Sequence, residues 1–472
     1  MKQTKIIATM GPASSSEAMI EKLIHAGVNV FRLNFSHGTH EFHAENIQKI
    51  RSISNKLSTP IGIMGDLQGP KIRVSKFENN QVELANGATI TLDVAYTGLG
   101  NAEIVGVDYK ELANDVTTGD ILLLDDGKIT FTVAKVEGQK IHCTVTQGGV
   151  LKSNKGINKL GGGLTAPALT EKDLEDIKFI ATQNLDYVAV SFPKSADDMI
   201  FARRKLVQAG SKAQIIAKME RTEAVFQNLH KIVEASDGVM VARGDLAVEV
   251  GESLVPGLQK KLVRTCRRLH KVSIVATQML ESMIENPVAT RAEVSDIANA
   301  VLDGTDAVML SAETASGSFP LQAVQTMARV CTEAEKMVDH DLDNQFQQEK
   351  FANIPQTVAM SAIFSAYHID AKAIVALTTS GSTARWMSRV ISDKPIYAIT
   401  DNLEGLNGMT LYRGVHPYLM PNASTDAAEQ AHLACDFLKR QLILQDGDTV
   451  VLTMGDKVSK VGSTNTVKIV TV

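Results

Sequence analysis

The feature that most constrains this chain is a repeated alternation of short apolar runs with longer amphipathic runs. A short apolar run is typical of a buried parallel strand, and an amphipathic run with a period near 3.6 is typical of a helix. Eight such strand–helix units favour a closed (β/α)8 TIM barrel over an open doubly wound sheet. The predicted strands cover residues 5–10, 28–35, 61–67, 187–192, 215–220, 238–242, 272–277 and 307–310.

The alternation stops after the third strand and resumes only at Thr170. Residues 71–164 show alternating polarity and turn signals in place of a helical period, which predicts a small inserted β domain. An unstructured loop of that length would be implausible in a compact domain. Three consecutive glycines, Gly161, Gly162 and Gly163, are a plausible hinge where the insertion returns to the barrel.

A polar stretch at residues 339–355 separates the barrel from a second, shorter series of strands and helices. This series predicts a separate open α/β domain at the C-terminal end. We therefore expect a barrel from residues 1–70 and 165–340, an inserted β domain from 71–164, and a C-terminal α/β domain from 341–472.

Composition excludes several classes of protein. A net charge of -5 over 472 residues does not indicate a nucleic-acid-binding surface. No apolar run reaches the roughly 18 residues of a membrane span, and the first residues lack the long apolar region of a signal peptide. The four cysteines are far apart, so they indicate neither a zinc site nor a disulfide framework. We expect a cytoplasmic protein that binds neither nucleic acid nor membranes.

Polar residues collect at the ends of six predicted strands. In a barrel, the carboxyl ends of all strands meet at one face, where the active site lies. The coincidence over six strands therefore indicates a functional site at that face. The residues concerned include Arg32, Asn34, Ser36, Asp66, Lys71, Arg73, Lys218, Glu220, Arg243, Gly244, Asp245, Thr277, Gln278, Ser311 and Glu313.

Lys218 and Glu220 are the most informative pair, because two residues two apart on a strand share one face. Taken alone, such a pair is usually an exposed ion pair. Glu220 and Asp245 are hard oxygen ligands, which suit Mg²⁺ or Mn²⁺ better than zinc. The turn at Gly244 would let backbone N–H groups approach a carboxylate.

Positive charge at Arg32, Lys71 and Arg73 suits phosphate. A metal and cations without a covalent nucleophile favour phosphoryl transfer, which needs positioning and charge neutralisation. Arg73 alone would be read as a solvated surface charge, and so would Lys155. Thr277 alone would be read as a strand-end hydroxyl that caps the next turn.

These residues resemble the pyruvate kinase family. The resemblance covers essentially the whole chain in the same order, and its motifs lie at residues 32–38, 65–66, 69–73, 217–220, 240–246, 276–280 and 299–311. It implies a catalytic barrel, a β-barrel lid inserted after strand three, a C-terminal regulatory domain and a homotetramer. It also implies transfer of phosphate from phosphoenolpyruvate to ADP, giving ATP and pyruvate, as the final step of glycolysis.

The resemblance also assigns roles by position. Glu220 and Asp245 would bind Mg²⁺, while Lys218, Arg32 and Thr277 would be catalytic. The further substrate-binding positions are Gly244, Ser311 and Glu313, with Ser311 and Glu313 near a proton relay. The nucleotide-binding positions are Asn34, Ser36, His37 and Arg73 in sequence order, followed by Lys155 in the lid.

Lys71 is a departure from many family members, which carry Glu there and need K⁺ near Asn34, Ser36 and Asp66. A Lys ammonium would supply that positive charge itself, so we expect activity without added K⁺. Leu67, where K⁺-dependent members typically have Thr, indicates the same.

A hydroxyl-rich loop in the C-terminal domain joins a strand to a helix N-terminus, which is a ready phosphate site. The family places a phosphorylated effector there, so we expect activation by a sugar phosphate or a nucleoside monophosphate. An ordinary capped helix is the alternative interpretation. The loop residues are Thr378, Thr379, Ser380, Gly381, Ser382 and Thr383.

Two other functions stay open at this point. A barrel lyase that handles phosphoenolpyruvate-type enolates would need no nucleotide site, which the insertion and Lys155 disfavour. A non-catalytic sensor of phosphorylated metabolites would be expected to lose at least one of Lys218, Glu220, Asp245 and Thr277. Pyruvate formation from phosphoenolpyruvate and ADP, with and without K⁺, separates the three.

Overall fold

A computed structural model describes residues 2–338, 350–421, 424, 426–456 and 460–472. Eight strands close into a barrel in the order β1-β16-β15-β14-β13-β12-β3-β2, and every neighbouring pair is parallel. The predicted (β/α)8 barrel is thereby confirmed. Its strands are β1 Lys5–Thr9, β2 Val30–Asn34, β3 Gly62–Asp66, β12 Tyr187–Val190, β13 Gln214–Lys218, β14 Gly238–Ala242, β15 Val272–Ala276 and β16 Ala307–Leu310.

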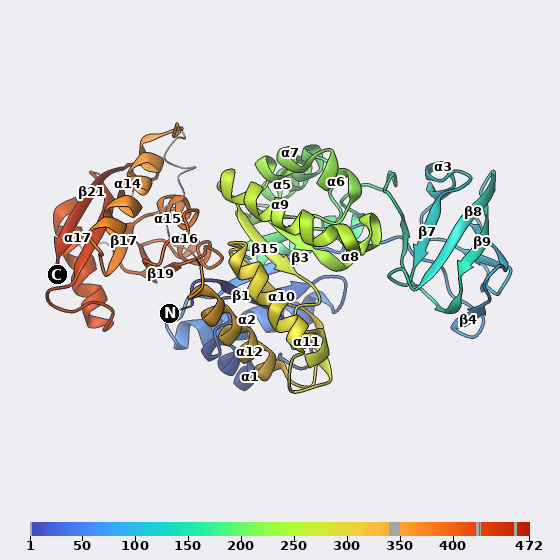
Figure 1. Cartoon of the computed structure of the whole chain (residues 1–472), viewed down its shortest axis with the longest axis horizontal. Coiled ribbons are helices and arrows are strands. Elements are labelled where there is room, and N and C mark those ends of the chain that lie inside the picture. Colours follow the sequence, from blue (N-terminus) through green and yellow to red (C-terminus); the bar gives the residue numbers. More distant parts are fainter. Residues whose placement is uncertain (1, 339–349, 422–423, 425, 457–459) are drawn as a thin grey trace.

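Helices surround the barrel and bury their apolar faces against the outward-facing side chains of the strands (Figure 1). Side-chain caps mark several helix starts, for example Thr170 before α4 and Thr290 before α10. These helices are α1 Glu17–His25, α2 His40–Lys56, α4 Glu171–Thr182, α5 Ala196–Gln208, α6 Thr222–Phe226, α7 Leu229–Ala235, α8 Arg243–Val250, α9 Val255–Arg268, α10 Arg291–Leu302, α11 Ala312–Ala315 and α12 Pro320–Glu335.

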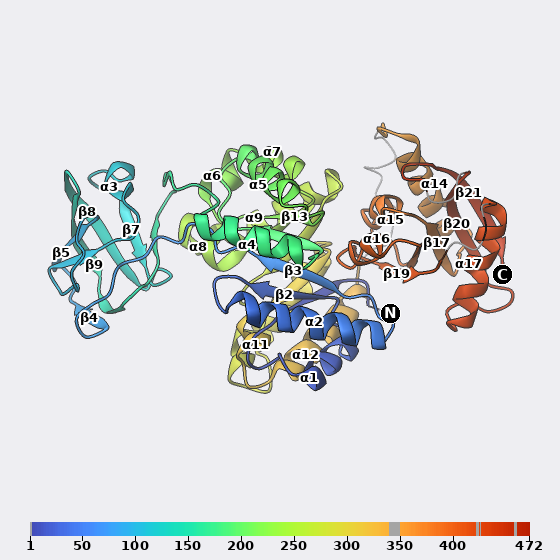
Figure 2. The same cartoon turned by 180° about the vertical axis from the view of Figure 1, so that it is seen from behind.

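The insertion after β3 is a β domain at one end of the molecule (Figures 1 and 2). It contains a six-stranded sheet in the order β11-β7-β8-β9-β5-β6 and a two-stranded sheet of β10 and β4. Its elements are β4 Gln81–Leu84, β5 Thr89–Asp93, β6 Ile104–Gly106, α3 Leu112–Asp115, β7 Ile121–Leu124, β8 Ile129–Glu137, β9 Lys140–Gln147, β10 Gly149–Lys152 and β11 Ile157–Lys159. Its apolar core consists of residues 72–164 alone.

The C-terminal domain lies at the opposite end and holds a five-stranded sheet in the order β19-β18-β17-β20-β21. Its only antiparallel neighbours are β20 and β21 among the described strands. The predicted boundary at residues 340–341 lies outside the described residues. The elements are α14 Ile354–His368, β17 Ala373–Leu377, α15 Ser382–Ser388, β18 Ile396–Thr400, α16 Leu403–Asn407, β19 Val415–Leu419, α17 Ala427–Arg440, β20 Thr449–Gly455 and β21 Thr464–Thr471.

The amino-terminal end of the barrel rests on this C-terminal domain. One continuous apolar cluster contains Met64 and Tyr187 from the barrel interior together with Met387 and Leu411 from the C-terminal domain. The Tyr187 hydroxyl lies 3.1 Å from the carbonyl oxygen of Asn407, to which it donates. The carboxyl end of the barrel, which faces the insertion, is thus left for the functional site.

Among the residues that the structure describes, no helix has both the length and the apolar character needed to cross a membrane.

Candidate active site

Lys218 is the centre of a buried cluster at the carboxyl end of the barrel. Its ammonium Nζ lies 2.9 Å from Glu220 Oε1 and 3.5 Å from Asp66 Oδ1, and it donates to Ser191 Oγ at 2.8 Å. Burial lowers the pKa of Lys218, but the charges of Asp66, Glu220 and Asp245 outweigh burial, so its pKa lies above the ordinary value. Lys218 and Glu220 point to the same place, as predicted, although β13 ends at Lys218 and Glu220 lies two residues beyond it.

Arg32 joins the same cluster through Asp66. Its Nε and Nη2 both lie 2.6 Å from Asp66 Oδ2, and its Nη1 donates to Thr9 Oγ1 at 3.1 Å. Burial raises the pKa of Asp66, yet Arg32 and Lys218 lower it further, so the pKa falls below its usual range. Asp66 therefore holds two cations in place on one side of the site.

Glu220 is fully buried, and each of its oxygens has one partner. The Phe192 amide donates to Oε2 at 2.8 Å, and Oε1 pairs with Lys218 Nζ at 2.9 Å. Burial raises the pKa of Glu220 to about 7, with Lys218 acting against this rise and Asp245 adding to it. Each carboxylate oxygen has two lone-pair sites, so Oε1 can take a metal ion as well as the Lys218 ammonium.

Glu220 and Asp245 fit a hard divalent cation that takes its other ligands from substrate and water. Asp245 is partly exposed, and Lys71 Nζ lies 3.9 Å from its Oδ1. No group of three or more His, Cys, Asp or Glu side chains that could hold a metal occurs among the described residues. The donor set therefore suits Mg²⁺ or Mn²⁺ rather than a metal enclosed wholly by protein ligands.

The segment around Gly244 is a correction to the sequence prediction. The expected turn is the first turn of helix α8, which begins directly after β14. The Gly244 amide donates to Thr277 Oγ1 at 2.8 Å, and that hydroxyl donates to the Ala276 carbonyl at 2.6 Å. The Gly244 amide and the Thr277 hydroxyl therefore lie side by side at the edge of the site.

Thr277 and Gln278 have φ angles of 69° and 55°, in the left-handed region. A β-branched residue rarely adopts this region, and such strain is concentrated at functional sites. Arg243 holds the strained turn, since its Nη2 donates to the Thr277 carbonyl at 2.7 Å and its Nη1 pairs with Asp296 at 2.7 Å.

Glu313 accepts hydrogen bonds from two backbone amides and does not face the open part of the site. Its Oε2 accepts from the Ser311 amide at 2.6 Å and its Oε1 from the Leu280 amide at 3.2 Å. Glu313 is 1% exposed. The carboxylate therefore joins the segments that follow β15 and β16, and Ser311 is held through its amide.

The predicted nucleotide residues fall into two groups. On the barrel, Asn34 ends β2 and Ser36 lies just beyond it, and Asn34 Oδ1 accepts from the Ser36 amide at 3.1 Å. In the insertion, Arg73 Nη1 donates to the Asn154 carbonyl at 3.0 Å and Lys155 Nζ lies 2.6 Å from Asp125 Oδ1.

The described contacts of Arg73 and Lys155 thus lie within the insertion, not in the Lys218 cluster. His37 is exposed just after Ser36, and its carbonyl lies 3.0 Å from His43 Nε2.

The Lys71 ammonium lies 3.9 Å from Asp245 Oδ1. Within the described chain its ion pair is with Asp245, and its ammonium is not paired with Asp66, whose partners are Arg32 and Lys218. The cation of Lys71 is therefore beside a proposed metal ligand.

Sequence reasoning missed two residues of the cluster, Thr9 and Ser191. Thr9 ends β1 and accepts from Arg32, and Ser191 follows β12 and accepts from Lys218. Both lie at carboxyl ends of barrel strands, so the strand-end argument would have found them had it included the first and fourth strands.

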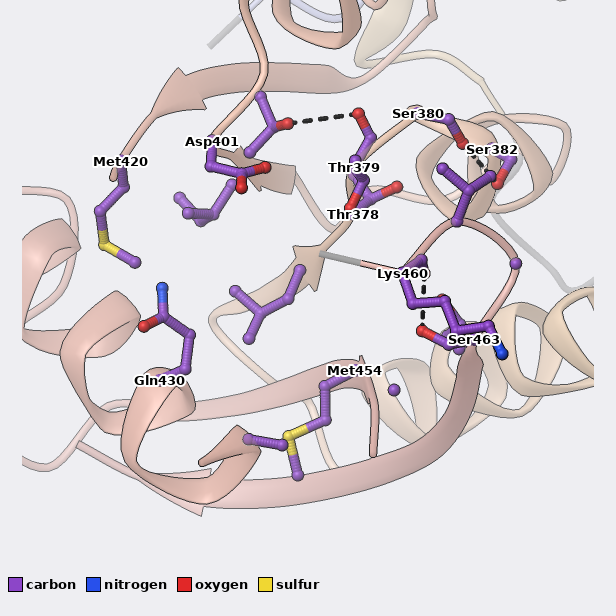
Figure 3. Close-up of a pocket in the computed structure, with 18 residues that line it drawn as sticks. Thr378, Thr379, Ser380, Ser382, Asp401, Met420, Gln430, Met454, Lys460 and Ser463 are labelled. Carbon is purple, nitrogen blue, oxygen red and sulfur yellow. Dashed lines mark hydrogen bonds between the residues drawn. The ribbon is translucent and has the colours of Figure 1, made fainter. Parts of the chain in front are cut away.

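The hydroxyl-rich loop of the C-terminal domain lines a pocket (Figure 3). Thr378, Thr379, Ser380 and Ser382 lie along one side, and the pocket also contains Asp401, Met420, Gln430, Met454, Lys460 and Ser463. Gly381 and Thr383 do not line it. Thr383 is 1% exposed and its hydroxyl lies 2.9 Å from Thr464 Oγ1, so it packs beneath the pocket.

Comparison with known proteins gives one consistent result. The family model for the pyruvate kinase barrel domain matches residues 1–324, and the model for the pyruvate kinase alpha/beta domain matches residues 356–470. Pyruvate kinase II of Salmonella typhimurium is 50% identical over 476 aligned positions, covering 100% of this chain and 99% of the relative. The pyruvate kinase of Haemophilus influenzae is 49% identical over 460 positions, covering 96% of each chain.

Solved structures agree with the sequence relatives. A crystal structure of a pyruvate kinase from Cryptosporidium parvum superimposes with a TM-score of 0.94 at 35% identity, covering 100% of this chain and 96% of that one. The barrel, the insertion and the C-terminal domain are therefore all shared. The chain belongs to the pyruvate kinase family of phosphotransferases.

Proposed function

We propose that this enzyme transfers the phosphoryl group of phosphoenolpyruvate to ADP, giving ATP and pyruvate in the final step of glycolysis. One observation carries the proposal: a buried ammonium, Lys218, is held between the carboxylates of Asp66 and Glu220 at the carboxyl end of the barrel. Fixed charge of this kind stabilises the negative charge that develops as a phosphoryl group departs. The names of the relatives support the same reaction.

In this proposal Glu220 and Asp245 would hold Mg²⁺ or Mn²⁺, which would supply positive charge to neutralise the substrate. Lys218 and Arg32 contact the transferring phosphoryl group, and Lys218 also faces the enolate. The Thr277 hydroxyl lies beside the Gly244 amide, so this edge of the site would receive the substrate's carboxylate side. Ser311 and Glu313 would keep this edge in place and lie near the proton relay.

The nucleotide would bind between the barrel and the inserted domain, which we propose acts as a lid. Asn34, Ser36 and His37 would line it from the barrel, and Arg73 and Lys155 from the lid. The present contacts of Arg73 and Lys155 lie within the lid, so closing would be needed to bring them to the nucleotide. A closed lid would exclude water and limit hydrolysis.

The test is a coupled assay of pyruvate formation from phosphoenolpyruvate, ADP and Mg²⁺. We expect ADP-dependent turnover that a Lys218→Met substitution lowers by about 10²–10³-fold, as for loss of one preorganised electrostatic contact. Lys178→Met, which removes an exposed lysine on α4, is the control and should leave turnover unchanged. Pyruvate released without ADP would instead favour a lyase.

We further propose that K⁺ is not required. The Lys71 ammonium lies 3.9 Å from Asp245, so a fixed cation is already present at the site. A Lys71→Glu variant should gain a requirement for K⁺, while the unaltered enzyme keeps its turnover when K⁺ is replaced by a large organic cation. A collapse of the unaltered enzyme's activity in K⁺-free buffer would contradict this.

The pocket at residues 378–382 supports a phosphorylated effector, either a sugar phosphate or a nucleoside monophosphate. Its hydroxyls and the start of α15 offer donors to a phosphate. A Ser380→Glu variant would place a carboxylate among these donors and should abolish activation. Activation that survives unchanged would remove the loop from the mechanism. Family membership also supports a homotetramer in the cytoplasm, which light scattering and cell fractionation would test.

A further inference from the structure

The loop after β2 is held from outside the barrel by helix α4. This loop, residues 35–40, carries Ser36 and His37, which the proposed function places beside the nucleotide. Lys172 Nζ donates to the Phe35 carbonyl at 2.8 Å, so α4 fixes the backbone at the start of the loop. Since backbone position decides where Ser36 points, this contact bears on nucleotide binding.

A second contact from α4 fixes the other end of the loop. His40 Nε2 lies 2.7 Å from Asp176 Oδ1, and the His40 ring stacks on Phe179 with centroids 4.4 Å apart and an interplanar angle of 6°. Asp176 Oδ2 accepts from Lys172 at 2.6 Å. One carboxylate therefore connects the two groups that hold the loop.

Burial and charge indicate that this arrangement is specific. Asp176 is 1% exposed, and each of its oxygens has its own partner. A buried carboxylate is costly unless it is paired, so Lys172 and His40 are held in defined positions around it. From α2, His43 Nε2 lies 3.0 Å from the His37 carbonyl, so the exposed His37 side chain stands on a backbone that is held by both α2 and α4.

The same helix also contacts both chain segments that lead to the lid. Asp173 Oδ1 accepts from the Gly69 amide, at the start of the insertion, at 3.1 Å. Its Oδ2 accepts from the amide and the hydroxyl of Thr170, just after the insertion ends, at 2.8 and 2.6 Å. Helix α4 thus contacts both the nucleotide loop and the two segments at the base of the lid.

We infer that Lys172 and Asp176 are positioning residues for the nucleotide, which act by holding the loop of residues 35–40 on α4. The inference rests on the proposed function, because that function places ADP at this loop. Neither side chain contacts the Lys218 cluster among the described contacts, so we expect their loss to leave phosphoenolpyruvate binding nearly unchanged. The effect of their loss should therefore fall on one substrate only.

The test compares substrate dependence in three variants of the full-length enzyme. In Lys172→Met and in Asp176→Asn, we expect KM for ADP and the calorimetric Kd for ADP with Mg²⁺ to rise about tenfold, as for loss of a hydrogen bond to a charged group. KM for phosphoenolpyruvate and kcat should stay within about twofold. Lys172→Arg keeps a donor and should restore most of the ADP affinity.

Glu175→Gln is the matched control, because it lies beside Asp176 on α4 but is exposed and pairs only with Lys178 among its described contacts. Unchanged ADP affinity in Lys172→Met would overturn the inference, and so would an equal rise in both KM values. Lys172 is half-exposed, so this variant folds even where Asp176→Asn does not. An unaltered enzyme without ADP-dependent turnover would instead contradict the proposed function.

Discussion

The insertion and the C-terminal domain are both attached to the same barrel, but by different kinds of contact. The insertion closes its apolar core on itself, with members only from residues 72–164. Its links to the barrel are polar, such as the Arg221 guanidinium to the Leu164 carbonyl and the Gly161 amide to the Glu249 carbonyl. The C-terminal domain instead continues the apolar core of the barrel interior, where Met64 and Met387 belong to one cluster.

This difference indicates which domain can move relative to the barrel. When two parts separate, the hydrogen bonds between them are exchanged for bonds with water at small net cost, whereas separating a shared apolar core exposes its whole area. The insertion can therefore shift as a unit while its own core stays intact. The C-terminal domain is expected to move and unfold together with the base of the barrel.

The largest effect is expected from a variant that removes the buried ion pair between Arg389 and Asp306. Both side chains are at most 3% exposed, and they join the C-terminal domain to the start of β16. Arg389→Met leaves a buried carboxylate without its main partner, so the free energy of unfolding should fall by about 3–5 kcal/mol. Urea denaturation followed by far-UV circular dichroism measures it.

Arg203→Met is the control for that experiment, because Arg203 pairs with Asp237 at 3.0 Å but is 41% exposed. Its loss should be about 0–1 kcal/mol. A C-terminal domain that melts separately from the barrel in the Arg389→Met variant would show that the shared core does not couple them.

A second test acts on the hinge of the insertion. Gly162 has a φ of +81°, and a Cβ there would lie 2.7 Å from a Glu223 carboxylate oxygen. Gly162→Ala should favour local opening of the hinge by about 1–2 kcal/mol, with global stability nearly unchanged. Native-state hydrogen exchange at the Gly163 amide, which donates to Glu223, measures the opening.

Gly161→Ala separates the two causes, since Gly161 has a similar φ of +85° but no atom within 4 Å of the added Cβ. It should open the hinge less than Gly162→Ala does. If Gly162→Ala lowered the melting temperature of the whole protein, the insertion would be more tightly coupled to the barrel than its contacts indicate.

A third test uses pH at the junction with the C-terminal domain. Burial and the charges of Arg389, Arg385 and Lys271 lower the pKa of His270 to about 4, and its ring lies edge-on to Trp386 with centroids 4.5 Å apart. Because this pKa lies below its unfolded value, the neutral form stabilises the fold. That contribution is complete above about pH 6.5 and is lost as pH falls towards 4.

The measurement is the urea midpoint at pH 7 and at pH 5 for the unaltered protein and for His270→Gln. We expect the variant to lose less stability on acidification, because it has no proton to take up at this site. If both proteins lost the same stability between pH 7 and pH 5, His270 would not contribute to the pH dependence of the junction.

The smallest expected effect is that of Lys71→Met on stability. Lys71 is one-third exposed and its nitrogen lies 3.9 Å from Asp245, so its loss should change the free energy of unfolding by less than about 0.5 kcal/mol. A urea titration beside that of Arg389→Met contrasts the polar links of the insertion with the buried links of the C-terminal domain. A loss of several kcal/mol would mean that the insertion is not held weakly.

Local pattern accounts for what the sequence predicted well. The barrel strands follow from apolar runs of strand length, and the Lys218 cluster follows because parallel strands bring their carboxyl ends together. The sequence pattern did not reveal the start of α8, because this helix follows β14 directly, with no loop residue between them. The partners of Lys71, Arg73 and Lys155 depend on where the insertion packs, and no local pattern encodes that position.

One contact at the base of the barrel has a consequence for exchanging parts between relatives. A Cβ at Gly62 would lie 2.4 Å from Thr410 Oγ1. The C-terminal domain can therefore pack this closely against β3 only because residue 62 has no side chain. A chimaera that joins this barrel to a foreign C-terminal domain should assemble only if the residues at positions 62 and 410 are chosen together. The residues at these two positions therefore indicate whether a given barrel and a given C-terminal domain can pack together.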